Sequence, residues 1–169
     1  MPDTQGQIAI RANFKGLPKI RKMLKVLADK GIDLQPAMET VSSIMEAAIM
    51  GNFDAKVSSR GGKWKPVRDW YAEQKREAGR DPGNILVYDG QLRQSLSQGT
   101  SATSQKAVVG TNLAYARIHN FGGTVGAGAL PRFAGKTIPR REFLFLTPDA
   151  KRQIKLAIMD FIMKNIVLG

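Results

Sequence analysis

The sequence contains no cysteine and a single histidine, His119. The lack of cysteine excludes disulfides, thiolate metal sites and a cysteine nucleophile, and it suits a reducing cytoplasm. A catalytic triad or a histidine metal site needs companions that a lone histidine does not have. The acidic residues are scattered, with no run that indicates the paired carboxylates of a glycosidase. We therefore expect no enzyme, no cofactor and no metal site.

Long apolar runs are also missing. No stretch approaches the roughly 18–20 continuous apolar residues of a membrane helix, so we expect no membrane partner. Acidic residues are outnumbered, because 26 Lys and Arg face 14 Asp and Glu and leave a net charge of +12. Such a balance attracts polyanions, meaning nucleic acid or an acidic protein face. The alternative is a solubilising surface with no specific partner.

Two glycine-rich stretches lack the continuation of a phosphate-binding loop. The first precedes Lys63, Trp64 and Lys65, and with Arg68 these lysines are candidate contacts for DNA or an acidic partner, by charge plus stacking. The favoured alternative is that Trp64 anchors its own loop to the domain. The second stretch begins at Gly122, and we interpret it as a flexible arm.

The N-terminal pattern predicts a strand over 7–14 and then a helix that opens at Pro18 and ends at Gly31. Asp33 is expected to cap the next helix, which continues to about residue 57. Because the connection is short, the two helices are expected to pack as an antiparallel pair.

The rest of the chain alternates between predicted helices and predicted β structure. Short helices are predicted near 69–78 and 113–121, the run Ile85–Tyr88 favours β structure, and 94–111 is predicted as a hairpin. A last strand or tight apolar segment follows at 143–146, and then a helix over 148–166 capped by Thr147. The order predicts one α+β domain over 1–169: an N-terminal helical hairpin, a small mostly antiparallel sheet, a short helix and a C-terminal helix, with extended loops at about 58–84 and 122–139.

Three motifs then stand in one order along the chain. They are Gly62-Lys-Trp-Lys-Pro, Ile85-Leu-Val-Tyr-Asp-Gly-Gln-Leu-Arg-Gln-Ser-Leu, and Val108-Val-Gly-Thr-Asn-Leu-Ala-Tyr-Ala-Arg-Ile-His-Asn-Phe-Gly-Gly, followed by Ile138-Pro-Arg-Arg-Glu-Phe-Leu-Phe-Leu. Over roughly residues 15–165 the chain resembles the phage virion morphogenesis family of Mu-like phages. In one departure, Arg140-Arg-Glu-Phe stands where Arg-Pro-Phe is common, which could alter how the loop enters the last strand.

The resemblance implies a structural virion protein, without catalytic residues, of the phage neck or tail end. Such proteins form rings, commonly of six subunits, around the DNA channel, so the expected partners are further copies of the chain, other neck, connector or tail tube proteins, and DNA. Its expected location is the virion, at the tail or head–tail junction. The alternatives are a nucleic-acid-binding protein that acts off the particle and a hydrolase with an unrecognised site.

A ring needs two unlike faces on each subunit. We expect the loop at 122–139 to reach a neighbouring copy and to become ordered only in the assembly, which protection from proteolysis would test. The candidate interface residues are Gly122, Gly123, Leu130, Phe133, Ile138 and Arg140. The candidate anchors of the fold are Trp64, Tyr115, His119 and Phe121.

Overall fold

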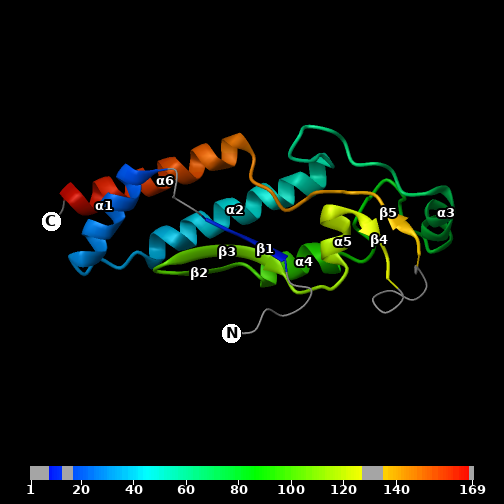
Figure 1. Cartoon of the computed structure of the whole chain (residues 1–169), viewed down its shortest axis with the longest axis horizontal. Helices are drawn as coiled ribbons and strands as arrows, with labels where there is room; N and C mark the ends of the chain where they lie inside the picture. The colour runs from blue at the N-terminus through cyan, green and yellow to red at the C-terminus, as the bar shows by residue number, and fades with distance from the viewer. Residues whose placement is uncertain (1–7, 13–16, 127–134, 168–169) are drawn as a thin grey trace.

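The computed structural model describes residues 8–12, 17–126 and 135–167, and it has an α+β fold (Figure 1). Two long helices lie beside a small antiparallel sheet, and shorter helices extend away from them. The elements in order are β1 (Ile8–Arg11), α1 (Pro18–Asp29), α2 (Gln35–Ala55), α3 (Asp69–Glu77), α4 (Gln91–Gln98), β2 (Ser101–Thr103), β3 (Lys106–Thr111), α5 (Ala116–Phe121), β4 (Gly123–Thr124), β5 (Thr137–Ile138) and α6 (Pro148–Val167).

The N-terminal helices begin and end where the sequence predicts. Gly31 takes a φ of 79° just after α1, and the Asp33 carboxylate accepts a 2.9 Å hydrogen bond from the Gln35 N–H at the start of α2. Their packing differs from the prediction, because α1 packs chiefly against α6 and α2 lies along α6 instead. The apolar stripe of α2 therefore has the C-terminal helix as its main helical partner.

The three-stranded sheet has the order β1-β3-β2, and both strand pairs are antiparallel. Helix α2 covers β2 and β3, and α4 packs on β3. The hairpin is confirmed for 101–111 but is wrong for 94–98, which belong to α4. Leu92 and Leu96 are buried four residues apart, a helical spacing that a β interpretation overlooks.

The apolar runs on either side of α5 form no strands. Ile85–Tyr88 forms turns and no strand, and Leu86 has a φ of 61°. Residues 143–146 were expected as a last strand or a tight apolar segment, and the second alternative is confirmed, because the segment is irregular with Phe143 and Leu144 buried. Helix α6 follows, and the Thr147 hydroxyl accepts a 3.1 Å bond from the Ala150 N–H, which confirms the predicted cap.

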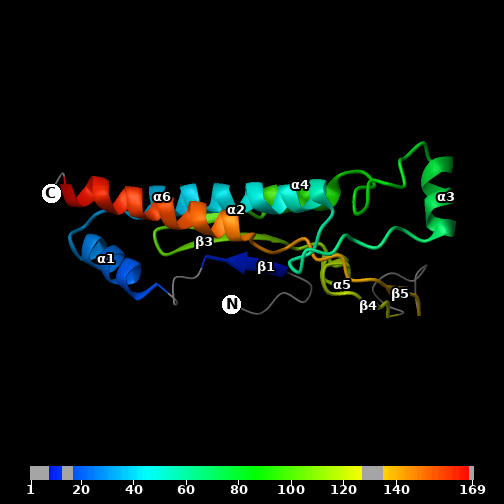
Figure 2. The ribbon, with the colours of Figure 1, turned by 90° about the horizontal axis from the view of Figure 1, so that it is seen from above.

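The two long loops lie away from the α2–α6 layer. Figure 2 shows α3, within the 58–84 excursion, at the end of the molecule opposite the C-terminus. In the 122–139 loop, β4 and β5 pair with Gly123 opposite Ile138, while residues 127–134, including Leu130 and Phe133, lie outside the described part of the chain. No described helix has the length and hydropathy needed to cross a bilayer.

Candidate assembly surfaces

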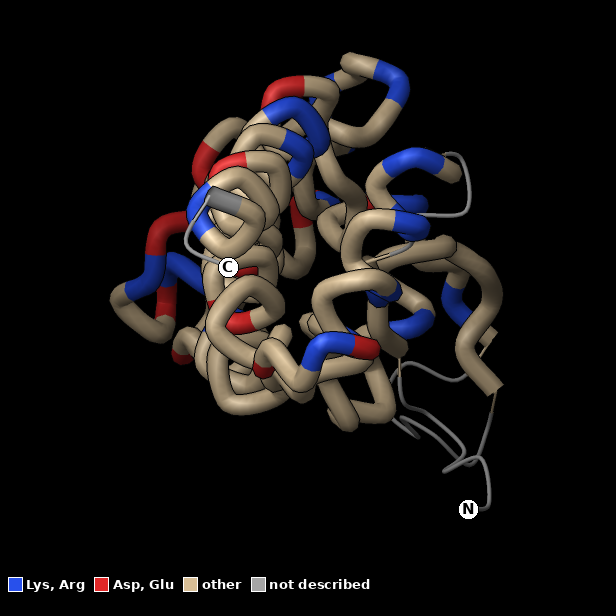
Figure 3. Tube along the Cα trace, turned by 90° about the vertical axis from the view of Figure 1, so that its left-hand side faces the viewer, with Lys and Arg blue, Asp and Glu red and all other residues tan. Residues whose placement is uncertain are grey.

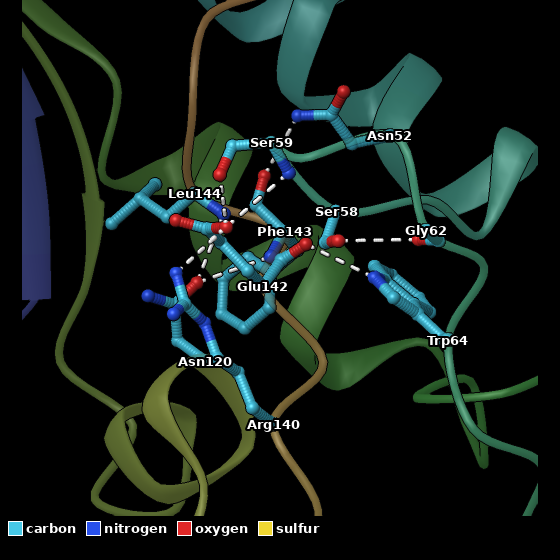
Figure 4. Close-up of polar contacts among 10 residues, drawn as sticks. All are labelled: Asn52, Ser58, Ser59, Gly62, Trp64, Asn120, Arg140, Glu142, Phe143 and Leu144. Carbon is cyan, nitrogen blue, oxygen red and sulfur yellow. Dashed lines mark hydrogen bonds and ion pairs between the residues drawn. The ribbon is translucent and has the colours of Figure 1, made fainter.

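Two buried asparagines hold the segment that leads into α6 (Figure 4). The Asn120 side-chain oxygen accepts hydrogen bonds from the backbone N–H groups of Phe143, at 3.1 Å, and Leu144, at 3.0 Å. From the opposite side, the Asn52 amide donates to the carbonyls of Phe143, at 2.9 Å, and Phe145, at 3.0 Å. Because the segment has no strand partner, these side chains supply the hydrogen bonds that a sheet would have supplied.

Trp64 and Glu142 join the 58–64 loop to the same segment (Figure 4). Trp64 is 5% exposed, packs edge-on against Phe53 with ring centroids 5.7 Å apart, and donates its indole N–H to the Glu142 carbonyl at 3.0 Å. The Glu142 carboxylate accepts from the Ser59 hydroxyl and N–H and pairs with Arg140 at 2.9 Å. Burial acts to raise the pKa of Glu142, but the hydrogen bonds from Ser59 and Arg140 outweigh it and lower the pKa.

Arg141 fixes the next stretch of the same loop. Its guanidinium donates to the backbone carbonyls of Lys65, at 2.8 Å, and Pro66, at 2.9 Å, and only 5% of the residue is exposed. Its backbone N–H donates to the His119 carbonyl at 2.8 Å. The residues that depart from the family pattern at 140–142 are therefore all engaged with their own chain.

Gly122 has a steric role that its interface prediction did not include. Its φ is 74°, and a Cβ built on it would lie 2.8 Å from the Arg140 backbone nitrogen. Only glycine allows the two backbones to approach this closely. Gly123 and Ile138 pair with each other, so each of the four described interface candidates has a contact within its own chain, and Arg140 remains exposed.

His119 is partly buried, and its Nδ1 atom is buried without a hydrogen-bond partner in the described structure. Its ring meets Tyr115 edge-on with centroids 5.9 Å apart. Burial, helped by the charge of Arg141, lowers the pKa of His119 to about 4, so the ring is neutral at pH 7. Phe121 was predicted as an anchor of the fold, and this prediction is wrong: 55% of the residue is exposed, because it ends α5 and points away from the core.

The candidate polyanion contacts Lys63, Lys65 and Arg68 are all exposed. Trp64 between them is buried, so its ring is not available for stacking on a base. Figure 3 shows Lys and Arg spread over many parts of the trace, not gathered in one tail. Within the described residues, no three acidic or histidine side chains gather in a way that could hold a metal ion.

A cavity of about 310 Å³ opens between α3, the 86–92 turn, α5 and β5, and we call it the aromatic groove. It is lined by residues from within 67–75, 86–92, 115–119 and 136–141, including Trp70, Tyr71, Tyr88 and Tyr115. Burial raises the pKa of Tyr115, and the nearby charge of Asp89 raises it further, so the Tyr115 hydroxyl in the groove is uncharged at pH 7.

Lys75 is a buried residue of the groove lining. It is 2% exposed and donates its amine to the carbonyls of Asn84, at 2.8 Å, and Val87, at 3.1 Å. Burial lowers the pKa of this amine. The lysine thereby fixes the turn that carries Tyr88.

A second apolar surface lies on α6. Leu156, Met163 and Ile166 are 61%, 52% and 46% exposed, and half-buried Met159 lies between them in sequence. The spacings of three, four and three residues place all four on one face of the helix, which we call the α6 stripe. The opposite face carries the core residues Ile154, Ile158 and Ile162.

The sequence interpretation missed Asn52, Asn120, Arg141 and Lys75. One signal was present, because Asn52 interrupts the apolar stripe of its helix and a polar residue there needs a buried partner. Nothing in the sequence pairs these side chains with the carbonyls and N–H groups that they contact. The α6 stripe could have been found from the sequence, because the apolar residues of this helix cover more of its surface than a single buried face needs.

These observations define an α+β protein whose described residues carry two exposed apolar surfaces and a basic charge. Residues 16–163 match the phage virion morphogenesis family, and the chain belongs to that family, which comprises proteins of structure or assembly and not enzymes. It is 30% identical to the Mu-like prophage FluMu G protein 2 of Haemophilus influenzae, over 90% of this chain and 95% of that protein. It is 29% identical to the putative capsid assembly protein G of Escherichia phage Mu, over 70% of this chain and 75% of that protein. No solved structure matches it.

Proposed function

We propose that this chain is a structural virion protein of the phage neck or tail end, a tail completion, terminator or head–tail joining protein. In this proposal it assembles as a ring, with six subunits the expected number, around the channel through which DNA passes. The family membership supports a role in building the particle. A relative described as a putative capsid assembly protein supports the same general role.

The observation that carries the ring is the pair of exposed apolar surfaces on different parts of the molecule. The α6 stripe, together with 45%-exposed Val26 on α1, belongs to helices at one end (Figure 1). Phe121 of α5, 55% exposed and outside the lining of the aromatic groove, belongs to an element toward the other end. A head-to-tail ring requires two unlike patches, which a two-fold dimer does not.

The net charge of +12 fits the same assembly. Most of the cations lie on the surface of several elements, including Lys19, Arg21 and Lys22 of α1. In a ring their charge is multiplied by the number of subunits, and it attracts DNA in the channel or acidic neighbours. Binding to duplex DNA would weaken by about 0.9 log units per log unit of salt for each phosphate neutralised.

The test is native mass spectrometry and negative-stain microscopy of the full chain. Leu156→Asp places a charge in the α6 stripe and is expected to convert rings into single subunits, because an interface core does not tolerate an unpaired carboxylate. The matched control is Gln105→Asp, which adds the same charge at an exposed position in the β2–β3 turn. Thermal unfolding shows whether both variants remain folded.

Two results would count against the proposal. A wild-type chain that stays monomeric at all concentrations reached would refute the ring. Rings that persist in folded Leu156→Asp, with the same stability as those of Gln105→Asp, would remove the α6 stripe from the interface.

A further inference from the structure

The aromatic groove is a second apolar surface that the ring need not use. Its exposed rings are Trp70 and Tyr88, at 44% and 40%, while Leu86 and Ile118 contribute partly buried aliphatic wall. At about 310 Å³ it lies at the lower end of the roughly 300–1,000 Å³ typical of ligand pockets. That space suits one or two large apolar side chains from a partner.

The rim of the groove is basic and has spare charge. The Lys136 amine lies 4.2 Å from the centre of the Trp70 ring, and the Arg80 guanidinium lies 4.3 Å from the centre of the Tyr88 ring. Neither of these cations, nor exposed Arg68, has a carboxylate partner among the described residues. Arg80 also donates to the Tyr88 backbone carbonyl, so Arg68 and Lys136 are the cations best placed to attract acidic side chains.

The one carboxylate in the lining does not cancel this charge. Asp89, which accepts a 3.2 Å hydrogen bond from the Gln91 N–H in the turn before α4, is one negative charge against the four Lys and Arg of the lining. The other two cations in the lining, Lys75 and Arg141, donate hydrogen bonds to backbone carbonyls of their own chain. Arg68 and Lys136 therefore remain as the charges that a ligand would meet at the mouth of the groove.

Charge distinguishes between two possible occupants of the groove, a second copy of this chain and a different protein with acidic residues. A second copy of this chain brings 26 basic against 14 acidic residues, so most of its surface would meet the rim with like charge. A partner with acidic residues around an apolar anchor satisfies both the rim and the walls. Such a partner is a different protein.

We propose that the aromatic groove docks an acidic segment of another virion protein, which inserts a large apolar side chain between Trp70, Tyr88 and Tyr115 and places carboxylates against Arg68 and Lys136. The inference rests on the proposed function, in which the chain is surrounded by other particle proteins. The apolar anchor supplies most of the binding free energy, and the carboxylates supply specificity and a faster encounter.

Fluorescence polarisation with three labelled peptides and the full chain tests this. The first peptide has a Phe-Leu pair flanked by glutamates, the second has the same pair flanked by lysines, and the third has glutamates around Gly-Ser. We expect only the first to bind. Tyr88→Ala is expected to weaken its binding by at least about fivefold, the effect of truncating an anchoring ring. Lys136→Glu is expected to weaken it by about fivefold, the upper range for an exposed charge pair.

The matched control is Lys22→Glu, which makes the same charge change at an exposed position of α1 and should leave peptide binding unchanged. Tyr88 and Lys136 are exposed, so neither variant should unfold the chain, and thermal unfolding verifies this. Equal binding of the first and third peptides, binding of the lysine peptide, or no binding of any peptide would overturn the docking site.

Native mass spectrometry of the same variants separates this proposal from the ring. If Tyr88→Ala or Lys136→Glu breaks the assembly, the groove is an interface between copies, and the acidic partner is refuted while the ring stands. If the wild-type chain is monomeric and yet binds the first peptide in the groove, the docking site stands and the ring fails.

Discussion

Replacing Asn120 with alanine removes one oxygen that accepts two backbone hydrogen bonds. The oxygen lies 3.1 Å from the Phe143 nitrogen and 3.0 Å from the Leu144 nitrogen, and Asn120 is 2% exposed. Each buried N–H left unpaired costs about 1–3 kcal/mol, so the two together predict a loss of about 2–6 kcal/mol in the free energy of unfolding. That is a large share of the roughly 5–15 kcal/mol available to a domain.

Urea unfolding followed by circular dichroism measures this loss. Asn112→Ala is the matched control, because Asn112 is exposed and its removal is expected to change stability by less than about 0.5 kcal/mol. If Asn120→Ala loses no more than this control, the two hydrogen bonds do not stabilise the segment and the reasoning is wrong.

A double-mutant cycle with Asn52→Ala sharpens the test. Asn52 donates to the carbonyls of Phe143 and Phe145 on the same segment. Once one asparagine is lost and the segment has loosened, the other contributes less, so the double variant should lose less than the sum of the two single variants. Strict additivity would show that the two side chains act independently.

The lowered pKa of His119, about 4 in the folded chain against 6.5 for a free histidine, predicts a dependence of stability on pH. Between these two values the unfolded chain binds more protons than the folded chain. The free energy of unfolding is therefore highest above pH 6.5 and falls by up to about 3 kcal/mol as the pH drops toward 4. Urea unfolding above pH 6.5 and near pH 4 should show a smaller loss for His119→Gln than for wild type, and equal losses would contradict the assignment. Gly122→Ala should destabilise by at least about 1–2 kcal/mol, because a side chain is strained at positive φ and its Cβ would also meet the Arg140 backbone at 2.8 Å. The control is Gly126→Ala, where a Cβ would meet no atom of the described residues within 4 Å, and an equal change in melting temperature for the two variants would refute the steric argument.

Local patterns predicted most of the helices. Pro18, Gly31, Asp33 and Thr147 mark helix ends through backbone geometry and capping bonds, which depend only on near neighbours. The same patterns failed at 94–98, where a short amphipathic helix with two leucines was taken for a strand. Short apolar segments do not distinguish helix from strand until a packing partner does.

The surfaces were harder to predict than the elements. Phe121 was expected in the core and is exposed, because the end of α5 faces away from the core and only the fold sets that direction. The aromatic groove joins four stretches that are distant in sequence, so no single motif contains it. The α6 stripe was accessible from periodicity, yet which half of a wide apolar face is buried depends on where α2 lies.

The sequence alone determined the class of protein: an α+β fold without cysteine, with one histidine, a strong positive charge and the motif order of the phage virion morphogenesis family. Composition and local spacing suffice for that, because charge, capping and periodicity are properties of the chain itself. Tertiary structure alone decided that α1 packs on α6 and that two apolar surfaces remain exposed. It also decided that Asn52 and Asn120 hydrogen-bond to the segment before α6. These depend on contacts between residues far apart in the chain, 93 positions for Asn52 and Phe145 and more for α1 and α6, whose partners are set only when the whole chain has packed.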